Sequence, residues 1–313
     1  MRVAITGATG LIGSALGTRL EDAGHTVVRL RRVERADGTT TGDEGAAWDP
    51  AAGWVAPGAL EGCDALVHLA GASIGEGRWT PKRKAVLRES RIEATRGLVK
   101  HLATLSDGPR VLVGASAIGV YGDRGDEPLD EGSRPAQGFL AELASDWERE
   151  ALAAEALGTR VAVARFGIVL DRQSGALPRM LLPFRFGAGG RLGSGRQWMS
   201  WVTLDDATRA VEFLLTHDLR GACNVTAPGA LTNREFTRVL ARVLHRPALF
   251  PAPAFVLRLA LGQAADELLL ASTRVTPRRL TAAGFAFEQP ELEGALRSVL
   301  ARDERGSVAR ALG

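Results

Sequence analysis

Three glycines near the N-terminus have the spacing of a phosphate-binding turn. Gly7, Gly10 and Gly13 follow an apolar run over residues 2–6, and an apolar helical pattern begins at Leu11. Small residues allow a tight turn and let backbone N–H groups approach a pyrophosphate, and the N-terminus of the following helix favours negative charge. The sequence therefore predicts a dinucleotide site. Its expected contacts on this turn are Gly7, Thr9, Gly10, Leu11, Ile12 and Gly13.

The residues at the end of the next apolar run distinguish between the two nicotinamide dinucleotides. A protein that prefers NAD usually has Asp or Glu about 20 residues beyond the glycines, where the carboxylate binds the ribose 2′-hydroxyl. This chain has Arg29, Arg31 and Arg32 there, and Glu34 follows only later. Guanidinium groups form paired hydrogen bonds with a 2′-phosphate, whereas a carboxylate repels it. We therefore predict NADP(H) as the cofactor, with Arg31 and Arg32 at the 2′-phosphate; the alternative is that these arginines are ordinary surface residues.

Alternating apolar runs and helical patterns predict the elements that position these residues. Strands are expected over residues 2–6, 26–31, 65–70, 111–116, 160–167 and 222–226. Such alternation is typical of a parallel sheet that is covered by helices. A long helix is expected to begin at Thr80 and Pro81, because threonine caps a helix and proline fits its first turn. A polar loop, expected to be flexible, spans residues 37–45.

The sequence changes in character after Val169. Residues 174–200 are rich in glycine and lack a clear period, and Thr232 with Glu235 has the spacing of a capping box before a short helix. We predict an α/β fold, a Rossmann-type doubly wound parallel sheet with a smaller, mainly helical C-terminal lobe. Residues 1–169 and 201–227 would form the NADP(H)-binding domain, and residues 170–200 and 228–313 a lobe that closes over the substrate.

The composition excludes several other classes of protein. The formal net charge is only +3, and no basic run with interleaved aromatic residues suggests nucleic-acid binding. No apolar stretch reaches the roughly 20 residues of a membrane span, and no signal peptide precedes the first strand. Cys63 and Cys223 cannot form a disulfide framework, so we expect a reduced, cytoplasmic protein without a membrane partner. The histidines are scattered, so no metal site is expected.

Ordered motifs continue along the chain after the glycine turn. They include Trp48-Asp49-Pro50, His68 to Gly71, Ser90-Arg91, Ser116 to Gly122, Trp147-Glu148, Arg165 to Leu170 and Gly193 to Gln197. Together they resemble those of atypical, extended short-chain dehydrogenases/reductases. More narrowly, the chain resembles the epimerase-family proteins that carry a C-terminal domain of uncharacterised function. The resemblance covers nearly the whole chain. It implies that the ribose and nicotinamide of the cofactor lie against Leu69, Ala70, Gly71, Ser116 and Val169.

The resemblance also implies where catalytic groups belong. Most members of that superfamily use a serine and a Tyr-x-x-x-Lys pair, in which the lysine lowers the pKa of the tyrosine. Tyr121 is the only tyrosine of this chain, and Phe139 and Leu143 occupy the positions of the pair in extended members. An unassisted tyrosine, with a pKa of about 10, stays protonated at neutral pH and donates a proton better than it accepts one. We predict Tyr121 as the proton donor and Ser116 as the group that orients the substrate oxygen; a purely packing or lining role for Tyr121 stays open.

Further residues are assigned to the lining of the substrate site. They are Glu142, Arg165, Gln197 and Trp201. Glu142 offers a second proton-transfer group if its helix turns it inward, and a solvated carboxylate otherwise. Gln197 lies with Arg191 and Arg196 in a glycine-rich loop that would suit an anionic group.

The leading function is that of an NADP(H)-dependent oxidoreductase that reduces a small organic carbonyl or conjugated double bond. Its partner would be a small-molecule substrate, and a homodimer is left open. Two alternatives remain. A sugar-nucleotide epimerase or dehydratase needs an effective base, which the missing Tyr-x-x-x-Lys pair does not supply. A regulator or scaffold would bind NADP(H) without turnover, so whether the protein is an enzyme at all is also left open.

Overall fold

The structure is a computed structural model that describes residues 1–33 and 46–311, with side chains up to residue 301. The predicted loop over residues 37–45 lies outside the described residues. The chain divides into two compact units. The first consists of Met1–Val120, Arg134–Arg165 and Thr208–Cys223, and the second of Tyr121–Ser133, Phe166–Ala207 and Asn224–Gly313. The domain limits expected from the sequence, at residues 169, 200 and 227, stay a prediction.

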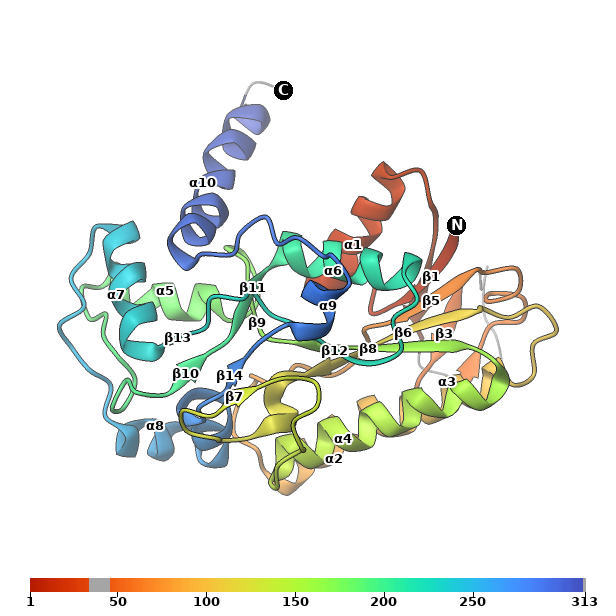
Figure 1. The fold of residues 1–313 in the computed structure, drawn as a ribbon, viewed down its shortest axis with the longest axis horizontal. Helices are drawn as coiled ribbons and strands as arrows, with labels where there is room; N and C mark the ends of the chain where they lie inside the picture. Colours follow the sequence, from red (N-terminus) through yellow and green to blue (C-terminus); the bar gives the residue numbers. More distant parts are fainter. Residues whose placement is uncertain (34–45, 312–313) are drawn as a thin grey trace. The chain divides into compact units, whose positions relative to one another are not determined.

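A sheet dominated by parallel strands forms the centre of the first unit (Figure 1). Its strand order is β12 (Gly221–Val225), β8 (Arg160–Phe166), β6 (Val111–Ala117), β5 (Ala65–His68), β1 (Arg2–Thr6), β2 (Thr26–Arg32), β3 (Ala47–Asp49) and β4 (Trp54–Val55). Val3 of β1 pairs in parallel with Val27 on one side and Ala65 on the other. Strands β1 and β5 are continuous apolar runs because neighbours cover both of their faces.

The strand order reverses at the centre of this sheet. From β1 the chain moves to β2 on one side, and β5, β6 and β8 follow on the other side. Ligands of open α/β sheets bind at the carboxyl ends of the strands where the order reverses, here β1 and β5. The Rossmann-type fold predicted from the sequence is confirmed, and each predicted strand is present within two residues at its end. Strands β3 and β4 were not predicted.

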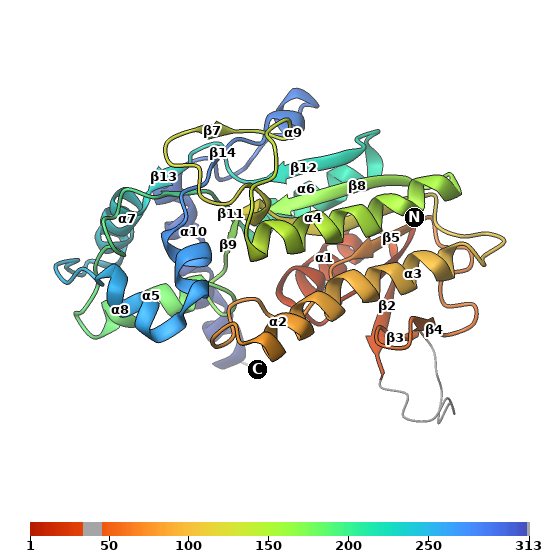
Figure 2. The same cartoon turned by 90° about the horizontal axis from the view of Figure 1, so that it is seen from below.

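Two long helical segments pack against each other in the first unit. The first consists of α2 (Pro81–Arg88), a π-helical turn η1 (Glu89–Glu93) and α3 (Ala94–Leu102). Figure 2 shows it as one rod that lies beside α4 (Phe139–Leu152). The predicted start of this segment is confirmed, since the Thr80 side chain accepts a hydrogen bond from Arg83 N and Pro81 occupies the first turn.

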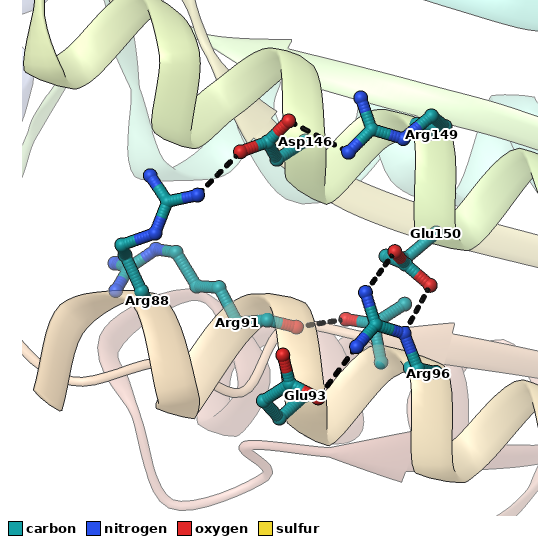
Figure 3. A network of polar contacts seen from close by, with 8 residues as sticks. Arg88, Arg91, Glu93, Arg96, Asp146, Arg149 and Glu150 are labelled. Atoms are coloured by element: carbon teal, nitrogen blue, oxygen red, sulfur yellow. Dashed lines mark hydrogen bonds and ion pairs between the residues drawn. The ribbon is translucent and has the colours of Figure 1, made fainter. Parts of the chain in front are cut away.

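Ion pairs fasten these two segments along their exposed edges (Figure 3). Arg88 binds Asp146 at 2.7 Å, and Arg96, further along the rod, binds Glu150 at 2.6 Å. Arg96 also binds Glu93 within its own segment at 2.7 Å. Because exposed ion pairs contribute little each, the buried face between the helices decides their packing. The remaining helices of this unit are α1 (Leu11–Asp22), the 3₁₀ turn η3 (Ala153–Leu157) and most of α6 (Leu204–Thr216).

The second unit consists of short strand pairs and several helices. Its strand pairs are β9 (Ile168–Leu170) with β11 (Trp201–Thr203), β10 (Trp198–Met199) with β13 (Leu231–Thr232), and β7 (Pro128–Leu129) with β14 (Arg274–Val275). Its helical elements are α5 (Leu177–Arg185), α7 (Asn233–Leu244), α8 (Ala254–Leu261), η4 (Ala265–Leu270), α9 (Arg278–Ala282) and α10 (Leu292–Ala311). The turn η2 (Ile118–Tyr121) ends at the first residue of the unit.

A separate apolar core holds the second unit together. It includes Trp201 and Leu170 from the strands, Leu181 from α5, Phe236 from α7 and Leu296 from α10, all nearly inaccessible. The predicted capping box is confirmed: the Thr232 side chain accepts from Glu235 N, and the Glu235 carboxylate accepts from Thr232 N at 2.9 Å. No helix in residues 1–33 and 46–311 has both the length and the apolar character to cross a bilayer.

Candidate functional site

Two of the three N-terminal glycines are required by the packing of the turn itself. Gly7 has a φ of +67°, and a Cβ on it would lie 2.9 Å from Ala70 N. A Cβ on Gly13 would overlap the Gly7 carbonyl group. These positions bring β1, the start of α1 and the chain after β5 closer together than any larger side chain allows.

Gly10 differs from the other two because it lies at the open surface of the turn. It is exposed, its N–H donates to Gly7 O at 2.9 Å, and it is the N-cap residue of α1. No side chain caps this helix, so the first-turn N–H groups of Leu11 and Ile12 are not covered by a capping group. A Cβ at Gly10 would extend from this surface with only Gly7 O nearby, at 3.2 Å. The residues therefore fit a pyrophosphate at this helix N-terminus.

A buried arginine supports the chain segment that follows β5. The Arg91 guanidinium donates to Ala72 O at 3.0 Å and lies 5.0 Å from the centre of the Trp147 ring. A Cβ on Gly71 would lie 3.1 Å from Arg91 Cζ, so this glycine allows the guanidinium to approach. Burial, together with the charge of Arg83, lowers the pKa of Arg91 to about 10. Arg91 belongs to a sequence motif but has no predicted role; its guanidinium holds Ala72, directly after the predicted cofactor contacts Leu69, Ala70 and Gly71.

A hydrogen-bonded histidine joins β1, β5 and the helical rod. His68 Nδ1 lies 2.7 Å from Thr6 Oγ1, and His68 Nε2 lies 2.8 Å from Thr95 Oγ1. Thr95 donates its own hydroxyl hydrogen to Arg91 O, so it accepts from His68 Nε2–H, and Nδ1 accepts from Thr6. Trp147 Nε1 donates to the same Thr95 oxygen at 3.0 Å. Complete burial, with a smaller contribution from the charge of Arg91, lowers the pKa of His68 to about 4 and keeps the ring neutral.

The arginines at the end of β2 divide into two kinds. Arg29 forms a bidentate ion pair with Glu21 at 2.5 and 2.8 Å, which raises the pKa of Arg29 and occupies its guanidinium. Arg31 and Arg32 are exposed where β2 pairs with β3. The predicted 2′-phosphate contacts are thus at the surface, and no ion pair occupies Arg31 among the described residues.

Ser116 lies at the end of β6 in a buried polar cluster. Ser116 Oγ donates to Glu148 Oε1 at 2.6 Å, and Arg165 binds both oxygens of the same carboxylate at 2.8 and 2.7 Å. All three residues are at most 7% exposed. The structure therefore brings the predicted residues Ser116 and Arg165 together through Glu148, a residue with no predicted role. Because the Ser116 hydrogen is donated to Glu148, the serine oxygen offers lone pairs to any further partner.

Tyr121 is fully buried within the second unit. Its hydroxyl donates to Asn224 Oδ1 at 2.8 Å, and Asn224 Nδ2 donates to Thr276 O at 3.0 Å. Its assignment as proton donor stays a prediction, since donation to a substrate requires the hydroxyl to leave Asn224.

In the first unit, Phe139 and Leu143 are buried apolar residues of α4, 8% and 2% exposed.

The other predicted lining residues lie in different environments. Gln197 donates to Leu192 O and Leu269 O, both at 3.1 Å, and Trp201 Nε1 donates to Gly229 O at 3.0 Å. Val169 pairs with Val202 between β9 and β11 and is half-buried. Glu142 is exposed on α4 of the first unit. In the part of the chain that the structure describes, no three His, Cys, Asp or Glu side chains gather as metal ligands would.

Comparison with known proteins relates this geometry to a family. The model of the NAD-dependent epimerase/dehydratase family matches residues 3–226, and a domain of unknown function, DUF1731, matches residues 252–299. An epimerase family protein of Mycobacterium leprae is 41% identical over 295 residues, which is 94% of each chain. The structure of human epimerase family protein SDR39U1 with NADPH is 34% identical with a TM-score of 0.85, covering 96% of this chain and 99% of that chain.

A second solved structure is similar over part of its own length. The nucleoside-diphosphate sugar epimerase from Corynebacterium glutamicum is 34% identical with a TM-score of 0.75, covering 95% of this chain and 57% of that chain. The resemblance stated from the sequence motifs is confirmed. With a family model over most of its length and relatives that match it almost end to end, the chain belongs to the NAD-dependent epimerase/dehydratase family.

Proposed function

We propose that the first unit binds NADP(H), with the pyrophosphate on the turn from Gly7 to Gly13 and the 2′-phosphate at Arg31 and Arg32. The exposed backbone at Gly10, at the uncapped start of α1, carries this proposal. Exposed arginines at the end of β2 support NADP(H) over NAD(H). Similarity to the human protein that was solved with NADPH agrees with it.

Two variants of the first helix test whether Gly10 faces the cofactor. Gly10→Ala should keep the free energy of unfolding within about 1 kcal/mol, because its backbone is extended and the added methyl group meets only Gly7 O, at 3.2 Å. The same variant should weaken NADPH binding at least about tenfold by crowding the pyrophosphate. Thr18→Ala, on the exposed side of the same helix, is the matched control and should bind NADPH as the unmodified chain does. Undiminished binding by Gly10→Ala would remove the turn from the cofactor site.

The reaction we propose is reduction of a small organic carbonyl or conjugated double bond. Bound NADPH supplies the hydride in this chemistry. Tyr121 would donate the proton by exchanging its hydrogen bond from Asn224 to the substrate oxygen. Ser116, whose hydrogen is held by Glu148, would accept a hydrogen bond from a substrate hydroxyl or a cofactor amide rather than donate to a carbonyl.

Turnover tests this reaction directly. NADPH absorbance should fall in the presence of an aldehyde, a ketone or a quinone from a standard panel. Tyr121→Phe should lower kcat at least about 100-fold while the Kd for NADPH stays unchanged. The unfolding free energy of this variant must be measured as well, since it also loses the bond to Asn224. Full turnover by a folded Tyr121→Phe protein would contradict the donor role.

One observation favours a sugar-nucleotide epimerase as the second candidate. An acceptor at Ser116, backed by Glu148 and Arg165, suits a sugar hydroxyl better than a carbonyl oxygen. The similarity to the Corynebacterium glutamicum epimerase points the same way. Against it, Phe139 and Leu143 leave α4 without the tyrosine and lysine that act as a base in related enzymes. Interconversion of a nucleoside-diphosphate sugar without net NADPH consumption would select this candidate.

Tight NADPH binding without conversion of any compound would favour a regulator or scaffold instead. The cytoplasm remains our proposed location, because Cys63 and Cys223 are both buried and neither forms a disulfide. A small-molecule substrate and a homodimer are likewise kept as proposals.

A further inference from the structure

A basic hollow of about 820 Å³ lies on the second unit between α7 and the chain that follows it. Twelve residues line it: Arg191, Arg234, Thr237, Arg238, Ala241, Arg242, His245, Arg246, Pro247, Ala248, Leu249 and Pro251. Five of them are arginines, and none is Asp or Glu. Small-molecule sites typically have volumes of about 300–1,000 Å³, so the hollow has the size of a ligand site.

The fold builds this hollow from one helix face and a returning segment. Arg234, Arg238 and Arg242 recur every four residues and therefore share one face of α7. Figure 1 shows the chain leaving α7 and descending to α8. This segment is held to the glycine-rich loop by three backbone hydrogen bonds: Phe250 N to Gly189 O at 3.1 Å, Ala252 N to Arg191 O at 2.9 Å, and Gly193 N to Ala252 O at 2.8 Å. The second bond places Arg191 opposite the helix face.

Most of the positive charge in the hollow is not neutralised by carboxylates. Arg242 binds Glu293 at 2.7 Å, while Glu235, near Arg238, is held in the capping box by Thr232. Within the described part of the chain, the exposed side chains of Arg234, Arg238 and Arg246 have neither an ion pair nor a side-chain hydrogen bond.

Like charges four residues apart repel one another on a helix, so this face is unfavourable without an anion. Because no ion pair or side-chain hydrogen bond among the described residues occupies the guanidinium groups of Arg234, Arg238 and Arg246, their N–H donors are available for a ligand.

We propose that this hollow binds a phosphorylated small molecule that carries at least two negative charges. Guanidinium groups form paired hydrogen bonds with phosphate oxygens, and three or more of them face one concave space. The proline and leucine side chains of residues 247–251 would contact the organic part of such a ligand. The lining has no Phe, Tyr or Trp side chain on which bases could stack, so a nucleic-acid strand fits the site less well. The proposal does not depend on the cofactor site of the first unit.

Calorimetric titration of the full chain with inorganic pyrophosphate tests the proposal. The double variant Arg234→Gln/Arg238→Gln should weaken pyrophosphate binding about tenfold to 100-fold. The matched control Arg258→Gln/Arg278→Gln removes the same charge from exposed arginines of the same unit, which pair with Asp266 and Asp130, and should bind pyrophosphate normally. Both variants should bind NADPH as the unmodified chain does, which separates this hollow from the glycine turn.

Three outcomes would overturn the inference. An equal loss in both double variants would show non-specific attraction to a basic surface. Loss of pyrophosphate binding in Gly10→Ala, but not in Arg234→Gln/Arg238→Gln, would place the anion on the glycine turn. Tighter binding of a single-stranded oligonucleotide than of pyrophosphate, with the same dependence on Arg234 and Arg238, would identify a nucleic-acid surface instead.

Discussion

Arginines are used in opposite ways in the two units. In the first unit, the Arg165 side chain is 8% exposed and binds both oxygens of Glu148, which in turn accepts from Ser116. In the second unit, Arg234 and Arg238 are exposed on α7, and neither forms an ion pair with a carboxylate among the described residues. A buried cation must be paired, so Arg165 serves to hold Glu148 and, through it, Ser116. An exposed and unpaired cation costs little and stays available to a ligand.

The largest expected effect comes from breaking the buried pair. Glu148→Gln removes the carboxylate that binds the buried Arg165 guanidinium through two hydrogen bonds, so the free energy of unfolding should fall by about 3–5 kcal/mol. Urea denaturation measures this change. The double variant Glu148→Leu/Arg165→Met removes both charges and should recover most of the loss. A cost below about 1 kcal/mol for Glu148→Gln would mean that water or another group compensates Arg165, and the contrast between the units would fail.

A pH-dependent loss of stability should come from His68, a buried titratable residue of the first unit. The pKa of His68 is lowered to about 4 in the folded chain, against about 6.5 when unfolded. Protons therefore bind the unfolded state more tightly. His68 contributes its full stability above pH 6.5, and this contribution is lost as the pH falls from 6.5 towards 4. The loss amounts to about 3 kcal/mol.

Denaturation curves at several pH values from 4.5 to 7.5 test this expectation. Other groups titrate in the same range, so the comparison is with His68→Gln, whose unfolding free energy should depend less steeply on pH. Identical slopes for the two proteins would contradict the neutral, buried His68. His25, which is half-buried, provides the matched control as His25→Gln.

The smallest expected effect is an increase in the free energy of unfolding, and it comes from the arginines of α7. Arg234→Gln/Arg238→Gln relieves repulsion between like charges on one helix face, so stability should rise by about 0.2–0.5 kcal/mol in low salt. The gain should shrink at high salt, where exposed charges are screened. Thermal unfolding at both salt concentrations measures it. A loss of more than 1 kcal/mol would show that these arginines hold the fold, as Arg165 does, and are not reserved for a ligand.

Local patterns explain what the sequence could predict. The turn at Gly7, the strand before it and the capping box at Thr232 depend on neighbouring residues, so spacing alone indicates them. Strands β3 and β4 could not be predicted because they have only three and two residues, too few to show an alternating pattern. They are held in the sheet by the pairing of β3 with β2 and of β4 with β3. The prediction of NADP(H) depends on the arginines of β2. One of them, Arg29, forms an ion pair with Glu21, which spacing in the sequence did not indicate.

The features that the sequence could not predict depend on contacts between residues far apart in the chain. Ser116 was selected from a motif, but its partner Glu148 lies 32 residues further along the chain and reaches it only when α4 packs against β6. The four-residue spacing of arginines on α7 is visible in the sequence. The hollow itself depends on the return of residues 247–251 beside Arg191, which no local pattern indicates.

Competition between the two nicotinamide dinucleotides tests whether Arg31 and Arg32 select NADPH. NADPH and NADH are titrated into the unmodified chain and into Arg31→Gln/Arg32→Gln, and the two Kd values are compared. We expect NADPH to bind the unmodified chain at least about tenfold more tightly than NADH, and the double variant to lose this preference while its affinity for NADH is kept. Equal or tighter binding of NADH by the unmodified chain would contradict the assignment of Arg31 and Arg32.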